Sequence, residues 1–197
     1  MEDSRESVDL VDQPTRRFVS PPPEEVAQLV HQAKDGRTDA FGKLVEIYRQ
    51  PIINLAYQIV GSRSDAEDVA QEAFIRAFQR LAEYREESRF FSWLYRIATN
   101  AALDRLRRRK VLPTSLHEDL PGWAEDGESE STRDTRLAVS IAMDKLPPEQ
   151  RVALVLRELH GLSYVDIAEI TGVAVGTVGS RIRSARQFLY RALRGAF

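Results

Sequence analysis

The sequence predicts an all-α fold in which two small helical domains are joined by a flexible acidic linker. Apolar residues recur at spacings of three and four through residues 24–111 and again through residues 137–197, which is the periodicity of amphipathic helices. No segment shows a convincing strand alternation. Residues 112–136 contain two prolines, two glycines and seven acidic residues, a composition typical of a mobile linker. Residues 1–23 end in three consecutive prolines and are expected to form a flexible tail.

The first domain is expected to begin with a short helix that runs from Glu24 to about Gly36 and is followed by a longer one. Pro51 lies inside the longer helical pattern and predicts a kink or a break there. Ser64 and Glu67 have the spacing of a capping box, which predicts that the next helix begins at Ser64. We expect the buried face of that helix to consist of Ala66, Val69, Ala70, Ala73, Phe74, Ala77, Phe78 and Leu81.

The polar side of the same helix carries an unusual stripe. It contains one bare aliphatic residue among carboxylates and amides, and its members are Asp68, Gln71, Glu72 and Ile75. An isolated isoleucine in such a stripe is consistent with a protein-binding surface, and an ordinary solvated face is the alternative. The neighbouring acids also have the spacing of a metal pair, but no histidine accompanies them, so we expect no metal.

A further helix is expected to start at Phe90 or Phe91 and to run into five basic residues within positions 105–110. One face of it, turned away from the aliphatic stripe, carries Trp93, Arg96, Asn100 and Arg107. Aromatic, guanidinium and amide groups together suit an unstacked base and its phosphate backbone. The alternative is that the aromatic residues belong mainly to the core, which we expect for Phe91.

The second domain has the pattern of a helix-turn-helix. Pro148 suits the first turn of a helix, Ser163 suits the N-cap of a short one, and Gly172 suits the tight turn that follows it. The last helix would then present short hydroxyl groups and a guanidinium near its start, namely Thr177, Ser180, Arg181 and Ser184. Such groups bind base edges and phosphates in a major groove. A generic helical hairpin with a solvated arginine face is the alternative.

The composition of the chain excludes several further classes of protein. The chain has no cysteine, which excludes disulfides, cysteine nucleophiles and thiolate metal sites. No apolar run is long enough to span a bilayer, and the acidic N-terminus is not a secretory signal, so we expect a cytoplasmic protein without membrane insertion. The net charge of −2 conceals two domains with a surplus of basic residues, 13 against 10 in 38–111 and 8 against 5 in 137–197. These basic clusters favour binding to phosphate backbones.

Three runs of sequence resemble a known family when they are taken in order. They are DAEDVAQEAFIRAF, FFSWLYRIATNAALDRLRRR and LPPEQRVALVLRELHGLSYVDIAEITGVAVGTVGSRI. Together they resemble the two domains of an extracytoplasmic-function (ECF, group IV) sigma factor of the sigma-70 family. The resemblance implies a sigma region 2 helical bundle over 24–111 and a sigma region 4 helix-turn-helix domain over 137–197, joined by the linker at 112–136.

The resemblance also implies a function, partners and site residues. The chain would bind core RNA polymerase through the β′ clamp helices and the β flap, and would direct promoter-specific initiation, under the control of an anti-sigma factor and in a stress or envelope response. Polymerase contacts would come from Asp68, Gln71, Glu72 and Ile75. The melted strand of the −10 element would be held by Tyr84, Arg85, Ser88, Arg89, Trp93, Arg96, Asn100, Arg107 and Arg108. The duplex −35 element would be read by Thr177, Ser180, Arg181, Arg183, Ser184 and Arg186.

The chain departs from the family at one position, and two other classes of function are alternatives to a sigma factor. Family members often carry Lys or Arg where this chain has Gly179, so the −35 specificity of relatives does not transfer. A helix-turn-helix regulator that binds an operator without polymerase is the alternative function, and it would not need the first domain. An enzyme is disfavoured because His31, His117 and His160 lie in different segments with no nucleophile beside them, and we expect neither a cofactor nor catalytic residues.

Overall fold

The computed structural model describes residues 21–85, 89–111 and 130–194, and these residues form helices and no strands. The N-terminal domain contains α1 (Pro23–Lys34), α2 (Thr38–Val60), α3 (Arg63–Gln79), the short 3-10 helix η1 (Leu81–Glu83) and α4 (Phe90–Val111). The C-terminal domain contains α5 (Glu130–Asp144), α6 (Pro148–Glu158), α7 (Tyr164–Thr171) and α8 (Val175–Leu193). The all-α prediction is therefore confirmed. The tail at 1–20 and most of the predicted linker lie outside the described residues.

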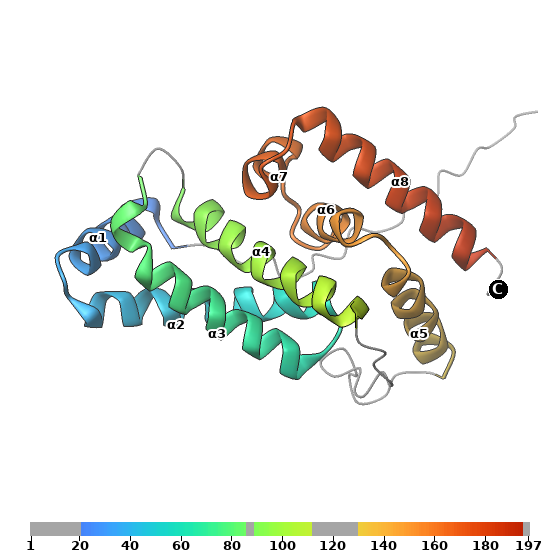
Figure 1. Ribbon diagram of the computed structural model, residues 1–197, viewed down its shortest axis with the longest axis horizontal. Helices are drawn as coiled ribbons and strands as arrows, with labels where there is room; N and C mark the ends of the chain where they lie inside the picture. The colour runs from blue at the N-terminus through green and yellow to red at the C-terminus, as the bar shows by residue number, and fades with distance from the viewer. Residues whose placement is uncertain (1–20, 86–88, 112–129, 195–197) are drawn as a thin grey trace, which may run out of the picture.

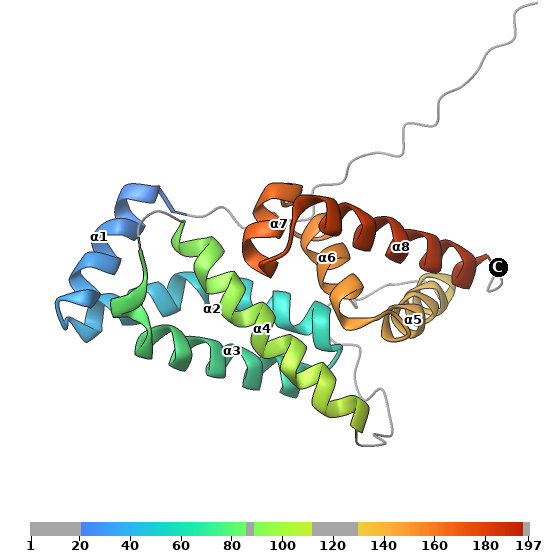
Figure 2. The same cartoon turned by 45° about the horizontal axis from the view of Figure 1, so that its top comes forward.

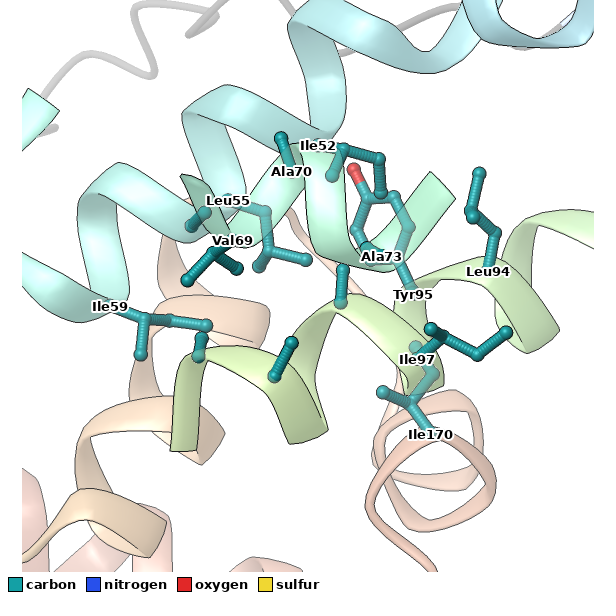
Figure 3. Packing of buried hydrophobic residues seen from close by; sticks show 14 of the residues in the cluster. Ile52, Leu55, Ile59, Val69, Ala70, Ala73, Leu94, Tyr95, Ile97 and Ile170 are labelled. Carbon is teal, nitrogen blue, oxygen red and sulfur yellow. The ribbon is translucent and has the colours of Figure 1, made fainter. Parts of the chain in front are cut away.

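The N-terminal domain is a bundle in which α2, α3 and α4 pack against one another and α1 covers one end of α2 (Figure 1). Each helix buries most of the stripe that its apolar spacing predicts. Ile52 and Leu55 of α2, Ala73 of α3 and Leu94 of α4 are all fully buried at the centre (Figure 3). Small residues on α3 allow the neighbouring helices to approach closely, and burial of this common core is the main source of the domain's stability.

Two local predictions for this domain were wrong. Pro51 neither ends nor splits α2, which runs without a break from Thr38 to Val60. The N-cap of α3 is Ser62 rather than Ser64, and its side chain accepts a hydrogen bond from the Asp65 amide at 3.4 Å. Gly61 explains the shift, because its left-handed conformation (φ 77°) ends α2 and leaves the next residue to cap α3.

In the C-terminal domain, α7 and α8 pack on α6, and α8 also contacts α5 (Figure 2). Pro148 occupies the first turn of α6, as expected. The α5 helix begins at Glu130 and not at 137, so the predicted linker is shorter at its C-terminal end. No helix within the described ranges is both long and apolar enough to cross a bilayer.

Candidate nucleic-acid and partner interfaces

The stripe predicted on α3 lies on the surface. Asp68, Gln71 and Ile75 are exposed, and Glu72 is partly exposed. Ile75 keeps 50% of its surface accessible, which is a high value for an isoleucine in a well-packed bundle. The carboxylate of Glu72 is bound by Arg76 one turn away, at 2.6 Å. The stripe therefore combines an exposed apolar side chain with acidic groups that lie beside arginines, Glu72 beside Arg76 and Asp68 beside Arg105.

Phe78 belongs to the same surface, although its apolar spacing predicts a place on the buried face. It is 50% exposed and packs the edge of its ring on Phe41, with ring centroids 5.0 Å apart. Because Phe78 follows Ile75 by three positions, the two residues lie on one side of α3. This spacing was the signal that could have identified Phe78 as a surface residue.

The segment that enters α4 holds an aromatic cluster. Tyr84 is only 6% exposed and packs against Phe90 and Trp93, with centroids 5.6 and 5.1 Å away. Lys34 Nζ donates to the Tyr84 carbonyl at 2.6 Å and lies 5.3 Å from the ring centroid. The structure therefore places Tyr84 in the core, where it supports this segment, and not on the predicted DNA surface.

The neighbouring candidates on this segment and on α4 are arranged as follows. Trp93 is partly buried. The exposed candidates are Arg85, Arg89, Arg96, Asn100, Arg107 and Arg108. Ser88 lies outside the described residues. The structure thus brings one amide and several guanidinium groups to the surface of the domain beside a partly buried indole.

Part of the arginine cluster at the end of α4 is used within the domain. Arg105 binds Asp65 of α3 through Nε at 3.0 Å and through Nη2, and Nη2 also lies 3.7 Å from Asp68. Hydrogen bonding to Asp65 raises the pKa of Arg105 further above its usual value, so the guanidinium stays charged. Arg105 therefore fixes α4 against α3, which leaves Arg107 and Arg108 as the exposed cations beside it.

The helix-turn-helix prediction is confirmed in its local details. Ser163 and Asp166 form a capping box at the start of α7, and Gly172 ends that helix with φ 69°. On α8 the exposed candidates are Thr177, Ser180, Arg183, Ser184 and Arg186, while Arg181 is partly buried. Arg186 Nε donates to Glu158 of α6 at 3.1 Å, so this arginine also holds α8 in place.

Gly179 does not face away from the domain. A Cβ at this position would meet the ring of Tyr164 at 3.6 Å, which is ordinary van der Waals contact. The Tyr164 ring itself lies 5.4 Å from the Arg157 guanidinium. A Lys or Arg side chain at position 179 would therefore leave α8 across Tyr164 of α7. Within the described residues, His, Asp and Glu form no group of three that could hold a metal ion.

Comparisons with known proteins agree with this architecture. Residues 44–111 match the family Sigma-70 region 2, and residues 136–189 match Sigma-70, region 4. The chain is 34% identical to the ECF RNA polymerase sigma factor SigW of Bacillus subtilis over 86% of its length and 97% of that protein. It is 39% identical to the RNA polymerase sigma-H factor of Pseudomonas aeruginosa over 86% of its length and 94% of that protein.

Two solved complexes have a similar fold. The structure of CnrH with the cytosolic domain of CnrY matches with a TM-score of 0.65 and 25% identity, over 87% of this chain and 98% of that one. Sigma factor RpoE with the anti-sigma factor NepR from Bartonella quintana matches with a TM-score of 0.62 and 25% identity, over 78% and 96%. The matched regions, their order and the coverage of whole relatives lead to one conclusion: this chain belongs to the sigma-70 family and is an ECF RNA polymerase sigma factor.

Proposed function

We propose that α3 is the surface through which this sigma factor binds core RNA polymerase, at the β′ clamp helices. The observation that carries the proposal is the pair Ile75 and Phe78, each half exposed, on the same face as Asp68 and Glu72. An apolar centre with a polar and charged rim is the usual anatomy of a protein interface. The helix lies within the segment that matches region 2.

The remaining candidate residues divide between the two promoter elements. In the N-terminal domain, Asn100 and Trp93 bind flipped bases of the melted −10 strand, and the exposed arginines around them bind its phosphates. In the C-terminal domain, α8 enters the major groove of the −35 element, and the rest of the domain contacts the β flap. The support for this division is the exposure of these groups and the helix-turn-helix geometry around Gly172.

The chain acts by positioning the polymerase and has no catalytic step of its own in this proposal. Its place of action is the cytoplasm, with the polymerase. Because one solved relative is held by an anti-sigma factor, we propose the same type of control here. Affinity capture of the chain from unstressed source cells tests this part, and recovery of the chain with no second protein in stoichiometric amount contradicts it.

The polymerase-binding surface is tested by the substitution Ile75→Glu in the full chain. We expect at least a tenfold loss of affinity for core polymerase, since a charge replaces the apolar centre of the interface. Ile75→Leu and Gln28→Glu are the matched controls, because the first keeps the apolar group and the second adds the same charge on exposed α1. Circular dichroism checks that all three variants remain folded. Unchanged binding by the folded Ile75→Glu variant would remove α3 from the interface.

A further inference from the structure

Helix α1 precedes the segment that matches Sigma-70 region 2, which begins at residue 44, but it contacts the part of the domain that we assign to the −10 element. It buries Val26, Val30 and Ala33, and it packs against both α2 and η1 (Figure 1). Because η1 is followed by the segment that enters α4, α1 lies beside the start of that segment.

Lys34, the last residue of α1, holds both the backbone and the ring of Tyr84. Its Nζ donates a hydrogen bond to the Tyr84 carbonyl at 2.6 Å. The same ammonium group lies over the Tyr84 ring, 5.3 Å from the centroid. A charged donor makes a stronger hydrogen bond than a neutral one, and the face of an aromatic ring attracts a cation. Lys34 therefore restrains both the peptide group and the side chain of Tyr84.

Tyr84 is the residue at which the chain leaves η1. Its backbone is extended, with φ −62° and ψ 127°, and its amide donates to the Leu81 carbonyl at 3.2 Å. The amide is thus bound within η1 and the carbonyl is bound by α1. Together these two hydrogen bonds set the direction in which the chain continues to Arg85.

The ring of Tyr84 belongs to a cluster of three aromatic rings. Its centroid lies 5.1 Å from that of Trp93 and 5.6 Å from that of Phe90, and the centroids of Phe90 and Trp93 are 5.6 Å apart. Tyr84 and Phe90 are buried, whereas Trp93 is only partly buried. Because closely packed rings move together, a displacement of Tyr84 would change the orientation of the indole. Contacts therefore connect Lys34 to Trp93 through one intermediate residue.

We propose that Lys34 is a positioning residue for −10 recognition, which fixes the orientation of the Trp93 indole through Tyr84 before DNA binds. The proposal rests on the assignment of Trp93 to the melted −10 strand made above. A base stacks most favourably on a ring that is already held in its bound orientation, because ordering a mobile side chain on binding reduces affinity. Loss of Lys34 therefore weakens capture of the melted strand without removing a group that touches it.

The test compares three variants of the full chain, Lys34→Met, Lys34→Arg and Lys43→Met. Methionine keeps an unbranched side chain without the charge and the donors, whereas arginine retains both. Lys43 is exposed on α2, so Lys43→Met removes an equal charge from a position with no proposed role. Circular dichroism checks that each variant remains folded.

The first measurement is acrylamide quenching of Trp93 fluorescence in the free chain. The chain has two tryptophans, and Trp123→Phe removes the other one from every variant. We expect the quenching constant to rise in Lys34→Met, because the indole is no longer held by Tyr84. It should keep the value of the parent chain in Lys34→Arg and in Lys43→Met.

The second measurement is the affinity of the holoenzyme for a fork template, which is duplex upstream and single-stranded over the −10 element of a promoter from which the wild-type holoenzyme initiates. Lys34→Met should bind this template about fivefold more weakly than the wild type, since the ordering of Trp93 now opposes binding. Lys34→Arg should restore most of the affinity, and Lys43→Met should bind as the wild type does. All three variants should bind core polymerase equally.

Equal quenching in Lys34→Met and the parent chain, or equal binding of the fork template, would overturn the proposal. A slope of log affinity against log salt concentration that is lower by about 0.7 in Lys34→Met would overturn it as well, because Lys34 would then bind a phosphate directly. Trp93→Ala in the same binding assay tests the proposed function separately. Wild-type binding by Trp93→Ala would contradict the −10 assignment, and the quenching measurement would still decide whether Lys34 orders the indole.

Discussion

Arg151 of α6 donates through Nη1 to the backbone carbonyl of Ile59, 92 positions earlier in the chain, at 2.7 Å. Its Nε and Nη2 also donate to the Met143 carbonyl at 2.9 and 2.7 Å, and Nη2 lies 2.5 Å from Asp144. The side chain is 4% exposed. A planar guanidinium donates in several fixed directions, so one residue joins the end of α2 to the turn between α5 and α6.

Replacement of Arg151 by Met should lower the free energy of unfolding by about 3 kcal/mol, because buried carbonyls and a carboxylate lose their donor. Arg151→Lys should also destabilise the chain, since a single ammonium group cannot donate in the same fixed directions as the planar guanidinium. The exposed Arg49 on α2 provides the control, and Arg49→Ala should change stability by no more than about 0.5 kcal/mol. Urea unfolding measures all three variants. A Met variant as stable as the wild type would show that the guanidinium has no structural role.

Gly179→Ala should stabilise the protein. The new methyl group would lie 3.6 Å from Tyr164 without a clash, and alanine favours a helix interior by roughly 0.5–1 kcal/mol over glycine. We expect the melting temperature to rise by about 2–4 °C. Gly172→Ala is the matched comparison of opposite sign, because Gly172 has φ 69° and alanine is strained there. A lower melting temperature for Gly179→Ala would mean that Tyr164 cannot accept the methyl group.

Mild acid should lower the free energy of unfolding because of His160. Burial lowers the pKa of His160 from 6.5 to about 4, so the folded chain holds this side chain neutral where the unfolded chain takes up a proton. The stabilising contribution is complete above pH 6.5 and decreases as the pH falls toward 4, by about 1–2 kcal/mol between pH 7.5 and 5.

The measurement is the free energy of unfolding in urea at several pH values between 7.5 and 5, for three chains. His160→Gln should remove most of the decrease, because glutamine does not titrate. His31→Gln should retain the decrease, since His31 is exposed on α1. The same pH dependence in the wild type and in His160→Gln would assign the effect to other groups.

Arg183→Ala should weaken binding of the holoenzyme to duplex −35 DNA. Arg183 is exposed on α8, and each lost phosphate contact reduces the slope of log affinity against log salt concentration by about one. Arg191→Ala removes an equally exposed arginine near the other end of α8 and should leave the slope unchanged. Fluorescence anisotropy over a range of salt concentrations compares the two, and identical slopes would place Arg183 outside the DNA interface.

The sequence predicted the helices and their buried faces because apolar spacing reports directly on which side of a helix is covered. It predicted the turn at Gly172 for a similar reason, since few residues other than glycine adopt its backbone conformation. The capping residue of α3 was missed because two serines stand close together, and the choice depends on where α2 ends. Glu67, which the predicted capping box required, instead pairs with Arg63 at 3.2 Å.

Pro51 and the packing of α7 on α4 illustrate what local patterns cannot show. Residues on both sides of Pro51, such as Tyr48 and Ile52, are fully buried, and their packing preserves the helix although proline lacks one backbone donor. Ile97 and Ile170 have the spacing of ordinary core residues, and nothing in that spacing says that they meet across a domain boundary (Figure 3). The exposure of Phe78 likewise depends on which neighbours reach it.

Promoter-directed transcription by core polymerase with this chain is the decisive test of its role as a sigma factor. Purified core enzyme, with and without the chain, is incubated with a genomic promoter library, and run-off transcripts are sequenced. We expect discrete start sites that require the chain and that share a −35 and a −10 element. Melting at these sites should be lost in Asn100→Ala while polymerase binding remains. Transcripts that are the same with and without the chain, or specific DNA binding that needs no polymerase, would contradict this role.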